Sequence, residues 1–183
     1  MSRRPDLHGR RVLLRSPIPS DALDRLRCGR DRHYVRMCGG DYRDIATLTR
    51  EQAEAWLAEQ HAHEHGWCME YEGRCIGSAG LHTLDQVNRH ARYAIGIFDA
   101  SARGIGLGSE ATRLILGYAF CTLNLHRVAL RVLSYNQQAI SCYRQCGFII
   151  EGVEREGALI AGEYESDTWM GILEQEYRRL APR

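Results

Sequence analysis

Residues 101–111, SARGIGLGSEA, place glycines alternately at 104, 106 and 108, and this stretch decides how the chain around it folds. An apolar segment precedes it, and residues 109–123 repeat apolar side chains at helical spacing. A strand that enters a glycine-rich turn and then a helix leaves backbone N–H groups unpaired, and the helix dipole adds partial positive charge. The stretch is therefore either a flexible loop or a cradle for a phosphate group.

Three classes of phosphate ligand suit such a cradle. A nucleoside triphosphate loop needs Gly-Lys-Ser/Thr after four spacer residues, and the sequence contains no such run. A dinucleotide site needs an acidic residue at the end of the next strand, where residues 133–136 are LSYN. The third pattern, R-x-x-G-x-G, is filled by Arg103, Gly106 and Gly108.

This third pattern resembles the coenzyme A pyrophosphate loop of the GNAT superfamily of N-acetyltransferases. Residues 136–148, NQQAISCYRQCGF, look like the second motif of that family, N-x-x-A-x-x-x-Y-x-x-x-G-F. The likeness covers most of the chain and points to the branch that holds the ribosomal-protein N-terminal acetyltransferases. It implies transfer of an acetyl group from acetyl-CoA to a primary amine, without an acyl-enzyme. The amine would belong to a protein N-terminus, a polyamine, or an antibiotic or other small molecule.

The resemblance also implies roles for single residues. Tyr143 would be the general acid for the departing thiolate, since a phenol with a pKa of about 10 is a usable proton donor. Backbone groups of Ile97 and Phe98 would meet the pantetheine arm, and the Ile97 amide would hold the oxyanion. The residues expected to bind acetyl-CoA are Ile97, Phe98, Arg103, Gly104, Ile105, Gly106, Leu107, Gly108, Ser109, Asn136, Ser141 and Tyr143.

The general base stays open from the sequence. Many relatives have a glutamate where Arg92 and Tyr93 stand here. Glu110, His82, Asp85 and a water relay are the alternatives, and the helix dipole alone explains Glu110. Arg92 would suit an acceptor that carries a carboxylate if it faces the acceptor groove. We expect that groove to be built from residues 28–50, 82–90 and 155–165.

Periodicity and turn signals predict one α+β domain over residues 1–183, in which residues 1–9 form a flexible arm. Helices are expected over residues 20–30, 50–64, 109–123 and 137–146. Strands are expected over residues 11–17, in a hairpin over 67–85, and over 90–99, 127–136, 148–160 and 163–173. The resemblance implies a mixed, mostly antiparallel sheet whose parallel strand pair is splayed, flanked by helices.

Composition limits the partners. The 24 basic and 23 acidic residues give a formal net charge of +1, so we do not expect nucleic acid or a membrane as a partner. Without an apolar run of roughly 18 residues or a secretion signal, the cytoplasm is the expected location. The seven cysteines form no CxxC pair, and His61, His63 and His65 match no complete metal pattern, so we expect no metal.

The expected partners are acetyl-CoA and an amine, with a homodimer as one arrangement known in the family. Three alternatives stay open: a non-catalytic acyl-CoA-binding regulatory module, a transferase for a different acyl-CoA, and a dinucleotide-dependent enzyme.

Overall fold

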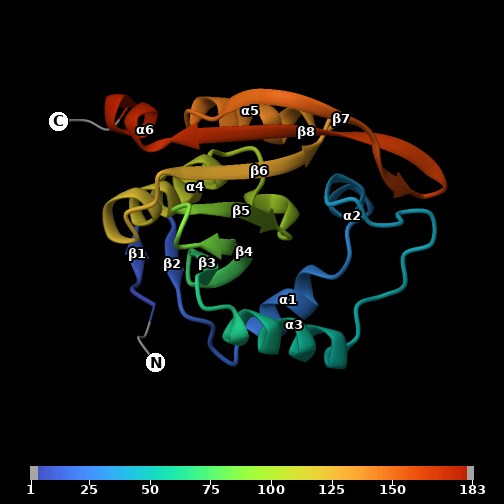
Figure 1. Cartoon of the computed structure of the whole chain (residues 1–183). Coiled ribbons are helices and arrows are strands. Elements are labelled where there is room, and N and C mark those ends of the chain that lie inside the picture. The colour runs from blue at the N-terminus through green and yellow to red at the C-terminus, as the bar shows by residue number, and fades with distance from the viewer. Residues whose placement is uncertain (1–3, 181–183) are drawn as a thin grey trace.

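The computed structural model describes residues 4–180. The strands are β1 (Leu7–His8), β2 (Leu13–Arg15), β3 (Gly66–Tyr71), β4 (Arg74–Asp85), β5 (His90–Ile97), β6 (Arg127–Leu133), β7 (Ile149–Ile160) and β8 (Glu163–Leu173). The helices are α1 (Asp21–Cys28), α2 (Arg32–Met37), α3 (Arg50–Ala62), α4 (Leu107–Gly117), α5 (Gln137–Gln145) and α6 (Glu174–Leu180). A 3₁₀ turn, η1 (Ala100–Ala102), precedes α4, and a π-helical turn, η2 (Tyr118–Thr122), follows it. Figure 1 shows their arrangement.

The strands form one sheet in the order β1-β2-β3-β4-β5-β6-β8-β7. Neighbouring strands are antiparallel except for β5 and β6, which the chain joins through a crossover that contains α4. This arrangement confirms the predicted α+β fold with a mixed, mostly antiparallel sheet in a single domain.

Helices cover both faces of the sheet. The main core lies between the sheet and α4 and α5, where Ile115, Leu130 and Met170 are fully buried. On the other face, α1 and α3 pack together, and Trp56 of α3 meets Phe98 edge to face with ring centroids 5.5 Å apart. Figure 1 shows α2 apart from this pair, beside the long β7–β8 hairpin.

Local signals in the sequence account for several helix boundaries. Thr49 and Gln52 form the capping box predicted at the start of α3. The Asn136 side chain accepts a hydrogen bond from the Ala139 N–H and caps α5. Gly147 ends the same segment with a φ of +99°, a conformation that favours glycine. The glycine-rich turn feeds α4 from Leu107, two residues earlier than predicted.

Residues 4–8, part of the arm predicted over residues 1–9, contact the rest of the chain; residues 1–3 lie outside the described part. Arg4 donates hydrogen bonds to the carbonyls of Gln60 and His61, and the Trp67 indole N–H donates to the Pro5 carbonyl. Leu7 and His8 pair with β2 as an edge strand. Long-range pairing of this kind leaves no mark in a polar, arginine-rich segment.

The parallel pair is splayed, as the resemblance implies. His90, Ala91 and Arg92 lie beside the start of β6, and pairing then stops. Beyond that point β5 stays paired with β4 as far as Ile97, and β6 stays paired with β8 as far as Leu133. The two strands therefore part and leave a gap between their unpaired edges.

Within residues 4–180, no helix is both long and apolar enough to cross a membrane.

Candidate active site

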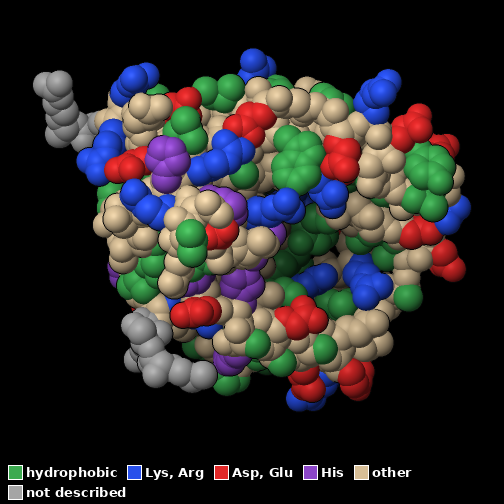
Figure 2. Space-filling view, in the orientation of Figure 1, with side chains coloured by type: hydrophobic (Ala, Val, Ile, Leu, Met, Phe, Trp, Pro, Cys, Tyr) green, Lys and Arg blue, Asp and Glu red, His purple; other side chains and the backbone are tan. Residues whose placement is uncertain are grey.

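A cleft of about 940 Å³ occupies the gap between β5 and β6. Figure 2 shows it as a hollow with apolar side chains in its depth and arginine side chains at its rim. Of the residues predicted to bind acetyl-CoA, those that line the cleft are Ile97, Arg103, Gly104, Gly106, Gly108, Ser109, Asn136, Ser141 and Tyr143. The fold thus brings together two sequence motifs that stand about 30 residues apart.

The backbone N–H groups of residues 104–109 form an open cradle at one end of the cleft. Within the described chain, none of them donates a hydrogen bond. The α4 helix begins at Leu107, so its first N–H groups have no helical partner, and the helix dipole adds positive charge there. Backbone amides in this arrangement suit the oxygens of a pyrophosphate.

The glycines of the cradle have different structural roles. Gly104 and Gly106 have φ values of +76° and +89°, which make the sharp turn into α4. Gly108 has no such requirement, and a Cβ there would lie 3.5 Å from Ile97 Cδ1 and 3.9 Å from Cys142 Sγ, both ordinary contacts. A side chain at Gly108 would therefore fit the protein and project toward the cleft.

Ile97 and Phe98 differ in what their backbones offer. The Phe98 N–H donates to the Ile76 carbonyl at 3.0 Å, which directs it toward β4, and the Phe98 carbonyl accepts from Arg103. Because N–H groups alternate between the two edges of a strand, the Ile97 N–H lies on the edge that β6 has left. Phe98 is buried outside the cleft, and the contact between its backbone and the pantetheine arm stays a prediction.

Tyr143 of α5 reaches the cleft from the main core. Its ring packs edge to face against Tyr93 and Phe148, with centroid distances of 6.2 and 5.8 Å. Burial, and to a smaller extent the nearby Cys142 thiol, raises the pKa of the Tyr143 hydroxyl. A phenol is protonated at neutral pH at its ordinary pKa, and the raised pKa keeps the Tyr143 hydroxyl in this proton-donating form.

Several polar side chains around the cradle already have partners. The Asn136 amide caps α5 and also donates to the Met37 carbonyl at 3.3 Å, which ties α5 to α2. Ser109 Oγ lies 3.1 Å from Cys142 Sγ. Asn136 and Ser109 therefore have hydrogen-bond partners within the protein. Both side chains also line the cleft.

Arg103 points toward α2. Its Nη1 lies 2.5 Å from Asp31 Oδ2, its Nη2 donates to the Phe98 carbonyl, and its guanidinium lies over the Tyr34 ring. Its Nε is buried without a hydrogen-bond partner. The charge predicted to meet a phosphate is thus paired with Asp31 in this structure.

The structure separates the candidate bases. Glu110 accepts hydrogen bonds from the N–H groups of Arg11 and Val12, so it joins α4 to the segment before β2 and lies outside the cleft. Asp85 holds the turn after β4 through Asn88. His82 lines the cleft with an exposed side chain, and its partial desolvation, with a smaller effect of Arg92, lowers the pKa of its imidazole. A neutral imidazole is the form that accepts a proton.

The sequence places one wall of the cleft within residues 28–50 but does not predict the α2 helix there, because residues 28–42 carry no long apolar period. Tyr34 stands over Gly96, where a Cβ would lie 2.5 Å from the Tyr34 hydroxyl oxygen. His33, Met37, Cys38 and Gly39 also line the cleft. Residues 158–160 of the β7–β8 hairpin line the cleft beside the end of α2. Parts of all three segments expected to build the acceptor groove therefore meet here.

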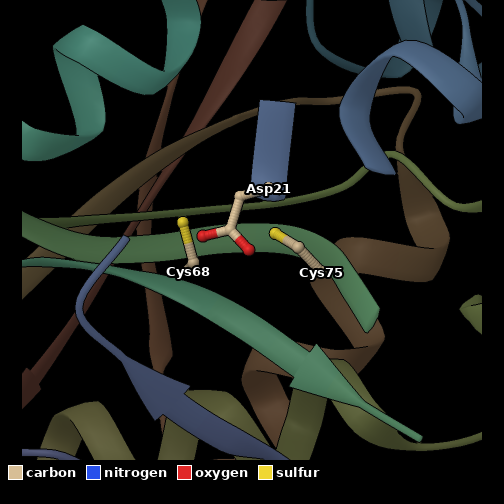
Figure 3. A group of neighbouring side chains, drawn as sticks. All are labelled: Asp21, Cys68 and Cys75. Atoms are coloured by element: carbon tan, nitrogen blue, oxygen red, sulfur yellow. The ribbon is translucent and has the colours of Figure 1, made fainter. Parts of the chain in front are cut away.

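A buried group of Asp21, Cys68 and Cys75 brings one carboxylate and two thiols together, as Figure 3 shows. Asp21 accepts two hydrogen bonds from Arg15, at 2.7 and 2.9 Å, and a third from the Ile18 N–H. The Cys75 thiol donates to the Gly77 carbonyl. Because the carboxylate is neutralised by a guanidinium, we assign the group a structural role and not that of a metal centre.

A splayed parallel pair that leads into an amide cradle, with a buried tyrosine on the following strand–helix unit, defines the CoA-dependent acyltransferase class of α+β proteins. The chain belongs to the GNAT acetyltransferase family, because the family model described as an acetyltransferase (GNAT) domain matches residues 11–149. GNAT enzymes use acetyl-CoA as co-substrate.

Three relatives illustrate the range of the family near this chain. Spermidine N(1)-acetyltransferase of Escherichia coli (strain K12) is 32% identical over 155 residues, 80% of this chain and 83% of that protein. YdaF of Bacillus subtilis (strain 168), named as a ribosomal N-acetyltransferase, is 34% identical over 108 residues, 58% of each chain. The structure of Vibrio cholerae spermidine N-acetyltransferase in complex with CoA and spermine matches with a TM-score of 0.76 and 25% identity, covering 92% of this chain and 98% of that one.

Proposed function

We propose that the protein transfers an acetyl group from acetyl-CoA to a primary amine by direct attack within a ternary complex. One observation carries the proposal. The backbone N–H groups of residues 104–109, at the end of the gap between β5 and β6, donate no hydrogen bond within the described chain. The pyrophosphate would bind this row. The pantetheine arm would extend along the open edge of β5, where the Ile97 N–H is available for the carbonyl oxygen of the thioester.

The acceptor would enter from the other side of the sheet, between α2 and the end of the β7–β8 hairpin. Tyr143 comes from the α4–α5 side, whereas His82 and Arg92 lie on the face opposite Tyr93. Acid and base thus approach the gap from its two sides. This separation suits a reaction in which one proton leaves the amine and another reaches the departing sulfur.

Bound acetyl-CoA supplies an activated acetyl thioester. His82, directly or through a water molecule, takes a proton from the attacking amine as the new C–N bond forms. Tyr143 gives its phenolic proton to the thiolate sulfur as the C–S bond breaks. The products are the acetylated amine and free CoA, and the proton held by His82 returns to Tyr143 through solvent, so the protein is unchanged.

Release of free CoA tests the proposal directly. The full chain is mixed with acetyl-CoA and a panel of amines and N-terminal peptides, and the free thiol is followed with a chromogenic reagent. Turnover that depends on one class of amine would support the proposal. Binding of acetyl-CoA without turnover of any amine would favour a non-catalytic acyl-CoA-binding module, and faster turnover of a longer acyl-CoA would correct the donor.

Two further expectations stay predictions. The cytoplasmic location and the homodimer rest on the sequence and on its resemblance to the family.

A further inference from the structure

We propose that the acceptor is a primary amine that also carries a carboxylate, and that the Arg92 guanidinium binds this carboxylate while it lies on Trp169. The inference rests on the proposed function, because it names the class of acceptor for the same cleft.

Arg92 stands where β5 and β6 part. It is the last β5 residue paired with β6, beside Ala129, and it lies opposite His82 in the β4–β5 ladder. Residues directly opposite in an antiparallel pair project to the same face, so Arg92 and His82 share one face of the sheet. Tyr93, the next residue, projects to the other face, where its hydroxyl lies 2.9 Å from Thr112 Oγ1 of α4. An amine bound at His82 therefore lies beside Arg92.

An aromatic ring holds the Arg92 side chain. The guanidinium carbon lies 4.8 Å from the centroid of the Trp169 ring. Ala129 lies beside Arg92, and over its β8 partner Gly171 lie the Arg127 guanidinium and the Glu151 carboxylate, which form an ion pair with each other. Stacking occupies the face of the guanidinium and leaves its in-plane N–H groups free to donate. Two of these N–H groups can bind a carboxylate in a bidentate arrangement.

The carboxylates near Arg92 are engaged elsewhere. Within residues 4–180, Arg92 forms no ion pair. Asp167, which lines the cleft, has its Oδ2 3.5 Å from Arg131 Nη1. Glu154 accepts a hydrogen bond from the Trp169 indole N–H at 3.0 Å. The guanidinium of Arg92 is thus oriented by its surroundings but not neutralised by them.

The balance of charge in the cleft points the same way. Among the described residues that line the cleft, there are three guanidinium groups and one carboxylate: Arg92, Arg103, Arg131 and Asp167. Arg103 is paired with Asp31 and Arg131 with Asp167, so the positive charge of Arg92 is unopposed. Figure 2 shows basic side chains at the rim of the hollow. A positive cleft attracts an anionic acceptor and repels a polyamine, which carries several positive charges.

Matched pairs of amines test the inference with the wild-type protein. β-Alanine is compared with β-alaninamide, and the peptide amide Asp-Ala-Ala with Asn-Ala-Ala, so that each pair differs by one carboxylate. Spermidine serves as the cationic probe. We expect kcat/KM, corrected for the fraction of free amine, to be roughly tenfold or more higher for the acid in at least one pair. A preference for the acid in the β-alanine pair would indicate a free amino acid as acceptor, and a preference in the tripeptide pair would indicate a peptide N-terminus.

Variants then assign the preference to Arg92. Arg92→Gln should reduce the acid-to-amide ratio of kcat/KM to near one, and Arg92→Glu should raise kcat/KM for spermidine above that for the acids. Arg178→Gln removes the same charge from α6, outside the cleft, and should leave the ratio unchanged. Thermal melting with and without acetyl-CoA verifies that each variant folds and binds the donor.

The outcomes separate this inference from the proposed function. Turnover that is as fast with amides or spermidine as with acids would overturn the acceptor class and leave amine acetylation intact. An acid preference that survives in Arg92→Gln would overturn the assignment to Arg92. Absence of turnover with every amine, despite acetyl-CoA binding, would overturn the proposed function and the inference together.

Discussion

Tyr143 is the residue on which the proposed chemistry depends most. Its ring is fixed by Tyr93 and Phe148, and burial keeps its hydroxyl protonated. A rigid, protonated phenol at the edge of the cleft suits proton donation to a departing thiolate. The sequence motif located this residue, and the structure adds the packing that fixes its ring.

Replacing Tyr143 by phenylalanine removes the proton and keeps the ring. We expect kcat to fall roughly 100-fold, in line with the usual contribution of a general acid, and the Kd of acetyl-CoA to change little. Stopped-flow release of CoA and calorimetric titration measure the two quantities.

Tyr118→Phe is the matched control, because the Tyr118 hydroxyl bonds His65 away from the cleft. Equal rates in Tyr143→Phe and this control would remove Tyr143 from the mechanism.

His82 determines the expected dependence of activity on pH. Partial desolvation and the charge of Arg92 lower the pKa of His82, so its imidazole becomes mostly protonated only below the ordinary value of about 6.5. Activity should therefore fall as the pH drops through this lowered pKa, because the protonated ring accepts no proton. In His82→Gln we expect kcat/KM at pH 8 to be lower by roughly 100-fold and this acid limb to be absent.

The control for His82 is His33→Gln, since His33 lines the same cleft from α2. Retention of the acid limb in His82→Gln would contradict the role of His82 and favour a water relay to bulk solvent.

At the scale of elements, the proposed binding of the pyrophosphate depends on the backbone at the start of α4. Gly104 and Gly106 serve the turn, whereas Gly108 has an ordinary φ and lies against the cleft. Gly104 and Gly106 are therefore expected to be needed for folding, and Gly108 for binding.

Gly108→Ala should leave the fold intact and weaken binding. Alanine favours a helix by up to about 1 kcal/mol over glycine, so thermal stability should not fall. The added methyl group would stand between the amides and the phosphate oxygens, and we expect the Kd of acetyl-CoA to rise on the order of tenfold.

Calorimetry on Gly108→Ala is compared with Gly117→Ala at the other end of α4. There the new Cβ lies 3.3 Å from the Tyr177 hydroxyl, the end of a side chain that can shift. Unchanged affinity in Gly108→Ala would place the pyrophosphate elsewhere.

The elements differ in how far the sequence predicts them. Strands and helices with clear periodicity, a capping box or an Asn cap, such as α3 and α5, are found close to their expected positions. The short α2 helix was not foreseen, because tertiary contacts hold it: Asp31 pairs with Arg103, and Tyr34 packs over Gly96. The cradle was predictable from its glycines, whereas for the acceptor wall the sequence indicated the segments but not the α2 helix or its contacts.

At the scale of the whole molecule, a buried ion network joins the first strands to α1. Arg15 lies between Asp21, at 2.7 Å, and Glu70, at 2.5 Å, with Asp21 fully buried and the Arg15 side chain 11% exposed. Both carboxylates raise the pKa of Arg15, so its charge is permanent. The network anchors α1 to β2 and β3 on the acceptor face of the sheet.

Asp21→Asn should destabilise the fold, because it leaves part of a buried guanidinium charge uncompensated. We expect the free energy of unfolding to fall by about 3 kcal/mol, measured by urea denaturation at pH 7. The control is Asp41→Asn, which breaks an exposed pair with Arg43 and should have no measurable effect. Similar stabilities of the two variants would contradict the structural role of the network.

The central claim is that the gap between β5 and β6 holds acetyl-CoA, and a crystal structure of the complex tests it most directly. We expect the pyrophosphate against the N–H groups of residues 104–109 and the thioester between the parted strands, with its sulfur within hydrogen-bond reach of the Tyr143 hydroxyl. A pyrophosphate bound away from residues 104–109, or a thioester outside the gap, would contradict the account.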